Sequence, residues 1–359
     1  MKVLNNCLHF KGDIPCKPHK MYSVHCEDCE YFTPIEKYIL IIKLGAAGDV
    51  IRTTPILHKL RSEFPKAEIT WLTDSPLFIP KEYVNTILEW NEKNVLWLQN
   101  REFDLLVNLD KDCHALALAK SVKATVKKGY LPDEFGKCQP ADADAEHKWQ
   151  TGLWDDLCMQ NHKSYPQEIF EMFGYEFAGE KYILDSPESD TEFNLPDGKR
   201  IIGLNTGCGT RWLTRLWGVK NWIDISNKLH EIGFAPLLLG GPIEHEMNTE
   251  IAANSKAIYL GYFDMKAFLN LCKKCDLIVT SVTMAMHIAI GYEKKLVLLN
   301  NIFNKYEFEL YGLGTILEPT GKDCLGCYKN TCEIECMSTI SPNLVLQTIE
   351  QLLGKLLEK

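Results

Sequence analysis

Three short stretches of this 359-residue chain carry residue types that suit a phosphorylated ligand. The first reads Gly-Ala-Ala-Gly-Asp over residues 45–49 and lies between an apolar run and an amphipathic stretch. Glycines let the backbone approach a ligand closely, and the N-terminus of the following helix favours negative charge. The full glycine fingerprint of dinucleotide-binding proteins is missing, so NAD binding is not indicated. Asp49 either caps the helix or serves as a functional carboxylate at the end of a strand.

The second and third stretches also lie where an apolar run gives way to a helix. Residues 205–210 (NTGCGT) precede Arg211 and Arg215, and a diphosphate needs such fixed donors and a cation. A surface loop with solvated arginines is the alternative. Residues 280–287 (TSVTMAMH) place hydroxyl groups at a helix N-terminus, where backbone N–H groups also bind phosphate oxygens. His287 lies inside this helix, and a packed core histidine is the competing interpretation.

Fourteen cysteines are many for a chain without an export signal, and in a reducing compartment they indicate metal ligands or buried thiols before disulfides. Four thiolates within reach suit tetrahedral zinc, and iron is chemically compatible. We therefore predict structural metal at two clusters, with buried free thiols as the alternative. The clusters are Cys324, Cys327, Cys332 and Cys336 near one end, and Cys7, Cys16, Cys26 and Cys29 near the other.

Two further pairs receive a plainer interpretation. Asp110 and Asp112 follow an apolar run, and such pairs hold a divalent cation against a diphosphate in some enzymes. The spacing is common by chance and the other two loops already supply phosphate donors, so we expect no metal there. Cys272 and Cys275 lie in a predicted helix and are expected to pack in the core.

The elements that position these stretches follow a strand–helix alternation. Near-continuous apolar runs such as residues 38–44 (YILIIKL) are typical of parallel strands covered on both faces. The alternation is lost between about 127 and 181, and it resumes after a polar stretch at 185–199. Strands are predicted at 38–44, 68–73, 103–109, 200–205, 235–239, 276–280 and 295–299, and helices near 222–229, 244–253, 265–275 and 343–357.

This organisation predicts an α/β protein with two doubly wound, Rossmann-like domains that face each other across a central cleft. Ligands of such sheets bind at the carboxyl ends of the strands, where the three stretches lie. The expected parts are a Cys-rich leader at 1–36, an N-terminal Rossmann-like domain at 37–184 and a linker at 185–199. A C-terminal Rossmann-like domain with a Cys cluster and a final helix is expected at 200–359.

Composition excludes several classes of protein. The net charge of −9 argues against nonspecific nucleic-acid binding, because no basic excess is present to release counterions. No run of about 18 apolar residues is present, and the first 25 residues have no apolar h-region. We therefore expect a cytoplasmic globular protein.

These segments together resemble glycosyltransferase family nine, the ADP-heptose:lipopolysaccharide heptosyltransferases. The motif ILIIKLGAAGDVIRTTP at 39–55 carries most of the resemblance. Coverage runs from about residue 37 to the end, apart from the middle segment. The other matching segments are 64–69, 202–207, 239–241, 283–289, 336–337 and 340–342.

The resemblance implies a GT-B fold and an inverting transfer that needs no metal or other cofactor. It assigns Asp49 as the general base and aligns Arg215 with the family's phosphate-binding lysine. It implies an ADP-sugar donor, with heptose expected, and a lipopolysaccharide core or other surface glycan as acceptor, with peripheral contact to the inner membrane. The donor-contacting positions implied are Gly48, Thr206, Gly207, Arg215, Thr283, Met284, Ala285 and His287.

The chain departs from the family pattern at two positions of the third stretch. Val282 stands where the family usually has an acidic residue, and Met284 replaces a frequent glycine. A missing carboxylate at position 282 leaves the identity of the sugar open. The C-terminal cysteine cluster resembles, with shorter spacing, the metal finger of heptosyltransferases that modify autotransporters.

Two other functions remain open at this point. A nucleotide-sugar 2-epimerase could use the same architecture, and it would turn over its substrate without an acceptor. A non-catalytic, metal-responsive binding protein would use the cysteine clusters instead, and it would transfer no sugar.

Overall fold

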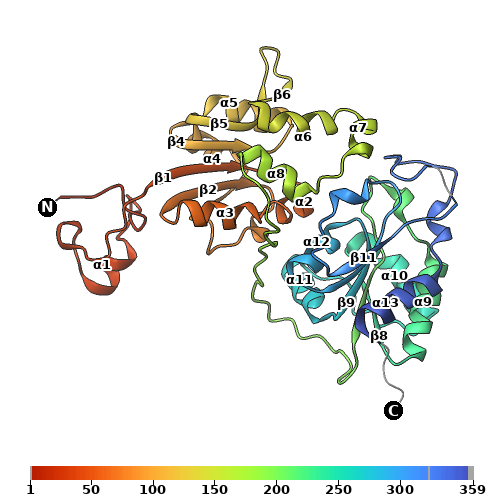
Figure 1. The fold of residues 1–359 in the computed structure, drawn as a ribbon. Helices are drawn as coiled ribbons and strands as arrows, with labels where there is room; N and C mark the ends of the chain where they lie inside the picture. The colour runs from red at the N-terminus through yellow and green to blue at the C-terminus, as the bar shows by residue number, and fades with distance from the viewer. Residues whose placement is uncertain (1, 322–323, 355–359) are drawn as a thin grey trace. The chain divides into compact units, whose positions relative to one another are not determined.

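The computed structural model describes residues 2–321 and 324–354 and divides them into two compact units (Figure 1). Unit 1 contains the residues up to 46 together with 54–149 and 169–180. Unit 2 contains 47–53, 150–168 and the residues from 181 onward. These bounds differ from the expected domain ranges, because two segments of the N-terminal half, 47–53 and 150–168, belong to the same compact unit as the C-terminal residues. One of them, 47–53, carries Asp49.

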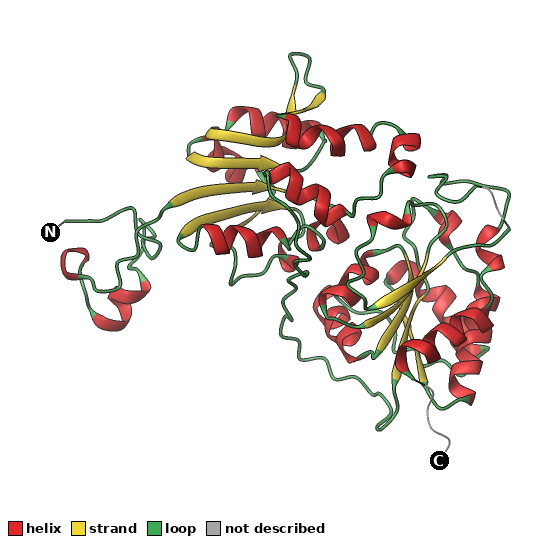
Figure 2. Ribbon diagram, viewed as in Figure 1, coloured by secondary structure: helices red, strands yellow, loops and turns green. Residues whose placement is uncertain are grey.

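Unit 1 is built on a six-stranded sheet of order β3-β2-β1-β4-β5-β6. All neighbouring strands are parallel except β5 and β6, which pair antiparallel (Figure 2). The central strand β1 is buried because its run of isoleucine and leucine is covered on both faces. The strands are β1 (Lys37–Ile42), β2 (Ala67–Thr73), β3 (Thr86–Glu89), β4 (Glu102–Asn108), β5 (Lys123–Pro132) and β6 (Cys138–Pro140).

The helices around this sheet follow the strands along the chain. Leu98 of α4 and Ala115 and Leu118 of α5 pack with Leu40 and Ile42 in one apolar cluster. The helices of the N-terminal half are α1 (Lys17–Tyr22), α2 (Ala47–Ile51), α3 (Ile56–Glu63), α4 (Glu92–Gln99), α5 (Cys113–Ser121), α6 (Glu146–Thr151), α7 (Asp155–Gln160) and α8 (Tyr165–Phe173).

Unit 2 is built on a five-stranded, all-parallel sheet of order β11-β10-β9-β7-β8. Figure 1 shows α11 and α12 on one side of this sheet and α9, α10 and α13 on the other. The strands are β7 (Ile201–Asn205), β8 (Ala235–Leu239), β9 (Leu277–Ser281), β10 (Lys295–Leu299) and β11 (Gly314–Leu317). The helices are α9 (Val219–Glu231), α10 (His245–Ala253), α11 (Met265–Lys274), α12 (Met284–Gly291) and α13 (Pro342–Leu353).

The predicted α/β class and its parallel strands are confirmed. The predicted strands at 235–239 and 295–299 match β8 and β10 in both bounds, since each is a bounded apolar run. The segment where no regular pattern was found contains most of β5 and all of β6, α6, α7 and α8. Residues 185–199, expected as a linker, contain no helix or strand.

Candidate functional site

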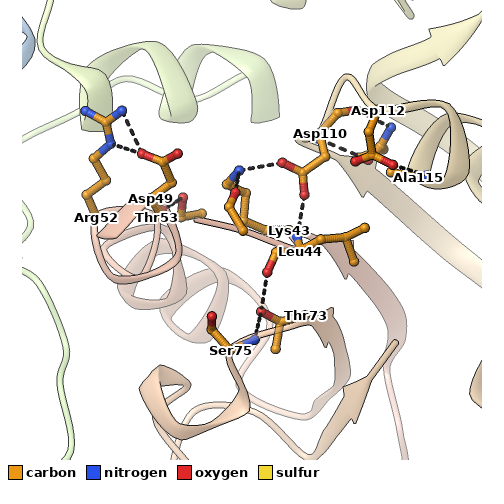
Figure 3. Close-up of polar contacts among 12 residues, drawn as sticks. Lys43, Leu44, Asp49, Arg52, Thr53, Thr73, Ser75, Asp110, Asp112 and Ala115 are labelled. Carbon is orange, nitrogen blue, oxygen red and sulfur yellow. Dashed lines mark hydrogen bonds and ion pairs between the residues drawn. The ribbon is translucent and has the colours of Figure 1, made fainter. Parts of the chain in front are cut away.

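Asp49 lies within the short helix α2, directly after the glycine-containing turn that follows β1. It is the third residue of the helix and lies in the first turn, where a carboxylate also interacts favourably with the helix N-terminus. Arg52 lies one turn later, and its Nε and Nη2 contact Oδ1 of Asp49 at 2.9 and 2.8 Å (Figure 3). The helical i,i+3 spacing brings the two side chains together. The carboxylate is therefore held at a defined place and keeps 34% of its side-chain surface exposed.

Arg52 is held in turn by two residues far along the chain. Its Nη1 donates to Oε1 of Glu307 at 2.9 Å, and Glu307 ends the 3-10 turn η6 (Lys305–Glu307). Its guanidinium carbon lies 3.6 Å from the ring centroid of Tyr165, the first residue of α8. Burial lowers the pKa of Arg52, but the carboxylates of Asp49 and Glu307 outweigh it and the pKa is raised. Arg52 therefore stays a cation.

His287 lies on α12, which packs directly against α2. The contact is so close that a Cβ added to Gly48 would lie 2.6 Å from Cδ2 of the imidazole. Burial and the nearby Arg52 lower the pKa of His287 to about 3, against the smaller opposing effect of Asp49. The imidazole is thus neutral at pH 7. Tyr182 lies with its hydroxyl 3.5 Å from Nδ1.

The loops after β7 and β9 are joined by one amide side chain. Nδ2 of Asn205 donates to the carbonyl oxygen of Gly207 and to the hydroxyls of Thr280 and Thr283, at 3.0–3.3 Å. Thr283 is the N-cap of α12, and its hydroxyl accepts from the backbone N–H of Ala285. Met284 is the first residue of that helix. The predicted phosphate-binding loops therefore form one hydrogen-bonded edge at the carboxyl ends of two neighbouring strands.

Thr206 and Gly207 continue this edge toward β8. The Thr206 hydroxyl donates to Oδ1 of Asn248 at 2.6 Å. Glu244 extends its carboxylate over Gly207, where an added Cβ would meet Oε1 at 2.1 Å. Sequence reasoning missed Glu244, although it follows a glycine pair at the end of a strand. A carboxylate beside such a loop can accept hydrogen bonds from ribose hydroxyls.

Arg215 is buried and directs its guanidinium at backbone carbonyls. Nη1 donates to the carbonyl oxygen of Val282, Nη2 to that of Cys208 and Nε to that of Trp212. Burial lowers its pKa, yet an arginine keeps its charge at neutral pH. Arg215 thus ties the β7 loop to the β9 loop. The contact with phosphate that the resemblance implies stays a prediction.

All nine residues expected in catalysis or donor binding lie in unit 2, in spite of their separation in sequence. These are Gly48, Asp49, Thr206, Gly207, Arg215, Thr283, Met284, Ala285 and His287.

The acidic pair of unit 1 has local structural roles. Lys43 donates to Oδ1 of Asp110 at 2.5 Å, and the N–H of Leu44 donates to Oδ2 (Figure 3). Asp112 caps α5 by accepting from the N–H groups of His114 and Ala115. The two aspartates also line an open pocket of about 380 Å³.

The cysteine clusters are not arranged as ligand sets. The eight cysteines are free thiols, and within residues 2–321 and 324–354 no group of three or more histidine, cysteine or acidic side chains is placed to hold a metal ion. The residues as placed do not fit zinc or iron. Metal binding by Cys324, Cys327, Cys332, Cys336, Cys7, Cys16, Cys26 and Cys29 stays a prediction from sequence, and no chemical step depends on it. Cys272 and Cys275 are buried, as expected of core residues.

No helix in the described part of the chain has both the length and the apolar content needed to cross a bilayer.

Comparison with known proteins identifies the family. The lipopolysaccharide core heptosyltransferase OpsX of Haemophilus influenzae is 21% identical over 283 residues, which cover 72% of this chain and 77% of OpsX. A solved family 9 glycosyltransferase from Veillonella parvula superposes with a TM-score of 0.68 at 20% identity, covering 89% of this chain and 97% of that one. The E. coli ADP-heptose lps heptosyltransferase II superposes with a TM-score of 0.62 at 18% identity, covering 88% and 98%.

The model of glycosyltransferase family 9 (heptosyltransferase) matches residues 96–312, which is more than half of the chain. The solved structures share its two-sheet α/β architecture. The chain therefore belongs to glycosyltransferase family 9, and it is an enzyme that transfers a glycosyl group.

Proposed function

We propose that this enzyme transfers heptose from ADP-heptose to a lipopolysaccharide core or another surface glycan, with inversion and with Asp49 as general base. The relatives support the donor and the acceptor class. OpsX is named a lipopolysaccharide core heptosyltransferase, and the E. coli protein is named an ADP-heptose lps heptosyltransferase. The observation that carries the proposal is the single, partly exposed carboxylate of Asp49, held by Arg52 in the same unit as the loops suited to phosphate.

The chemistry is one displacement at the anomeric carbon. The acceptor hydroxyl gives its proton to Asp49 as its oxygen forms the new bond to that carbon. The bond from the anomeric carbon to the diphosphate breaks, and ADP leaves with the electron pair. A single displacement inverts the configuration.

The departing diphosphate needs fixed positive charge and hydrogen-bond donors. The N-terminus of α12 supplies backbone N–H groups and the favourable end of the helix dipole. Thr283 caps that helix, and Asn205 joins it to the β7 loop. Arg215 adds a buried cation that joins the same two loops. Because these groups can carry the leaving-group charge, we expect transfer to proceed unchanged in the presence of EDTA.

The test compares Asp49→Asn with the wild type in a heptose-transfer assay. The amide preserves shape and cannot take the proton, so we expect kcat/KM to fall by about 10²–10⁴-fold. Asp224→Asn is the matched control, because Asp224 is an exposed carboxylate on α9. Full activity of Asp49→Asn with an intact fold would remove the base assignment. Conversion of the nucleotide-sugar into its 2-epimer without any acceptor would favour an epimerase instead.

Donor choice is measured separately through ligand-induced stabilisation. ADP-heptose at 100 times its dissociation constant should raise the free energy of unfolding by about 2.7 kcal/mol, which shifts the melting temperature upward by several degrees. Stabilisation by another nucleotide-sugar would reassign the sugar, in keeping with Val282 at the position where a carboxylate is usual.

A lipid-linked acceptor would place the enzyme at the cytoplasmic face of the inner membrane as a peripheral protein. Co-sedimentation with lipopolysaccharide-containing vesicles, but not with phospholipid vesicles, is the expected result.

A further inference from the structure

We infer that Arg52 is a positioning residue for Asp49, and that Glu307 tunes how strongly its charge acts on that carboxylate. The inference rests on the proposed function of Asp49 as general base. It concerns two residues that the motif-based assignment leaves without a role in the reaction.

The geometry specifies one orientation of the guanidinium. Arg52 uses two N–H groups on the same oxygen of Asp49 and a third on Glu307, all at 2.8–2.9 Å. The face of the planar group lies against the ring of Tyr165. Contacts with residues of α2, η6 and α8 therefore fix the orientation of the guanidinium plane. The ammonium group of a lysine could not make all of these contacts at once.

Arg52 lies between the two carboxylates and is the most buried of the three charges, which makes the coupling effective. Asp49 has 34% of its side chain exposed, Glu307 20% and Arg52 12%. Charges that are partly removed from water interact more strongly than surface pairs. Asp49 is the most exposed of the three, so the member that must meet an acceptor hydroxyl is also the most accessible.

The two carboxylates compete for one cation. Arg52 favours the ionised form of Asp49, which keeps the base ready at neutral pH but also lowers its basicity. Glu307 shares the positive charge and so preserves part of that basicity. Among the described residues, Tyr165, Tyr182 and His287 are further titratable groups close to Arg52.

Two of these groups stay neutral across the range in which the base is assayed. The pKa of His287 is lowered to about 3, chiefly by burial. Burial raises the pKa of Tyr182 above its usual value, although Arg52 opposes the shift. An acidic limb in the rate profile whose midpoint matches the carboxyl signal missing from Asp49→Asn is therefore assigned to Asp49 and not to His287 or Tyr182.

The experiment measures the titration of Asp49 directly. Protein labelled with ¹³C at aspartate carboxyl groups is titrated by NMR, and the signal missing from Asp49→Asn identifies the residue. The same variants are assayed for the pH dependence of kcat/KM. The variants are Arg52→Gln, Arg52→Lys and Glu307→Gln, with Glu318→Gln as control. Glu318 forms an ion pair at 3.1 Å with Lys305, which belongs to the same turn as Glu307. Glu318→Gln therefore removes a nearby negative charge that does not contact Arg52.

Opposite shifts are expected from the two partners. Arg52→Gln removes the attractive charge and should raise the midpoint of Asp49 by about one unit or more. Glu307→Gln leaves the whole charge of Arg52 on Asp49 and should lower the midpoint by a few tenths of a unit. Arg52→Lys should titrate with an Asp49 midpoint close to that of the wild type, because it keeps the positive charge. Its kcat should stay low, because lysine lacks the planar guanidinium that holds the carboxylate in place. Glu318→Gln should match the wild type.

The outcomes separate this inference from the proposed function. Midpoints that do not move, or that move in one direction for both variants, overturn the inference even if Asp49→Asn is inactive. An active Asp49→Asn removes the base and the inference with it. Failure to transfer any sugar counts against the proposed function alone, because the NMR midpoints still report the coupling. Should Arg52→Gln not fold, Glu307→Gln and Arg52→Lys decide the result.

Discussion

The buried imidazole of His287 makes the stability of this enzyme depend on pH in a predictable way. Its pKa is lowered from the usual 6.5 to about 3 in the folded chain, because burial and Arg52 disfavour the charged form. The folded-state pKa is thus below that of the unfolded chain, which binds the proton more readily. Stability is fully present above pH 6.5 and is lost as pH falls from 6.5 toward 3.

The magnitude follows from the width of that window. Each pH unit below 6.5 costs up to about 1.4 kcal/mol. Acidification from pH 7 to 5 crosses about 1.5 units of the window and should cost about 2 kcal/mol from this residue. Other groups also titrate, so the useful quantity is the difference between the wild type and a variant that lacks the imidazole.

Urea unfolding of the wild type and of His287→Gln at pH 7 and pH 5 measures that difference. The variant loses packing against Gly48 and should be the less stable protein at pH 7. Its disadvantage should shrink by about 2 kcal/mol at pH 5, since it has no imidazole to protonate. His230→Asn replaces an exposed histidine on α9 and should show no such change. An equal disadvantage at both pH values would refute the assignment of a buried, neutral His287.

Three further results are expected. Lys43→Met should lower the free energy of unfolding by about 3–5 kcal/mol, because it leaves the buried carboxylate of Asp110 without its cationic partner. The double replacement with Asp110→Asn should recover most of this loss in the same urea assay. Gly207→Ala should abolish most of the donor-induced rise in melting temperature, because its Cβ would displace the Glu244 carboxylate, whereas Gly241→Ala should not, since its Cβ would lie 3.5 Å from the same group. Elemental analysis checks the predicted metal: zinc or iron that is lost on serine substitution in the C-terminal cysteine cluster would support it, and metal-free native protein would contradict it.

The local sequence pattern was enough to predict those elements whose residues are all buried or all exposed alike. β8 and β10 were predicted in both bounds because a parallel strand buried on both faces needs an unbroken apolar run. The turn at 45–49 and the hydroxyl-rich start of α12 were also evident, since each lies where an apolar run meets a helix. β5 was missed because it lies near the edge of its sheet and its first half exposes Lys123, Thr125 and Val126 to solvent, which breaks the apolar run.

The sequence by itself therefore determined the α/β class, most central strands and the residues that could bind a phosphorylated ligand. Only the tertiary structure decided their partners. Arg52 and Glu307 are 255 positions apart, and Arg215 and Val282 are 67 apart. Hydrophobic periodicity indicates which face of an element is buried, but it carries no information about which distant side chain contacts that face. Such contacts depend on how the sheets and loops pack. The contact between Glu307 and Arg52 could therefore be identified only from the tertiary structure.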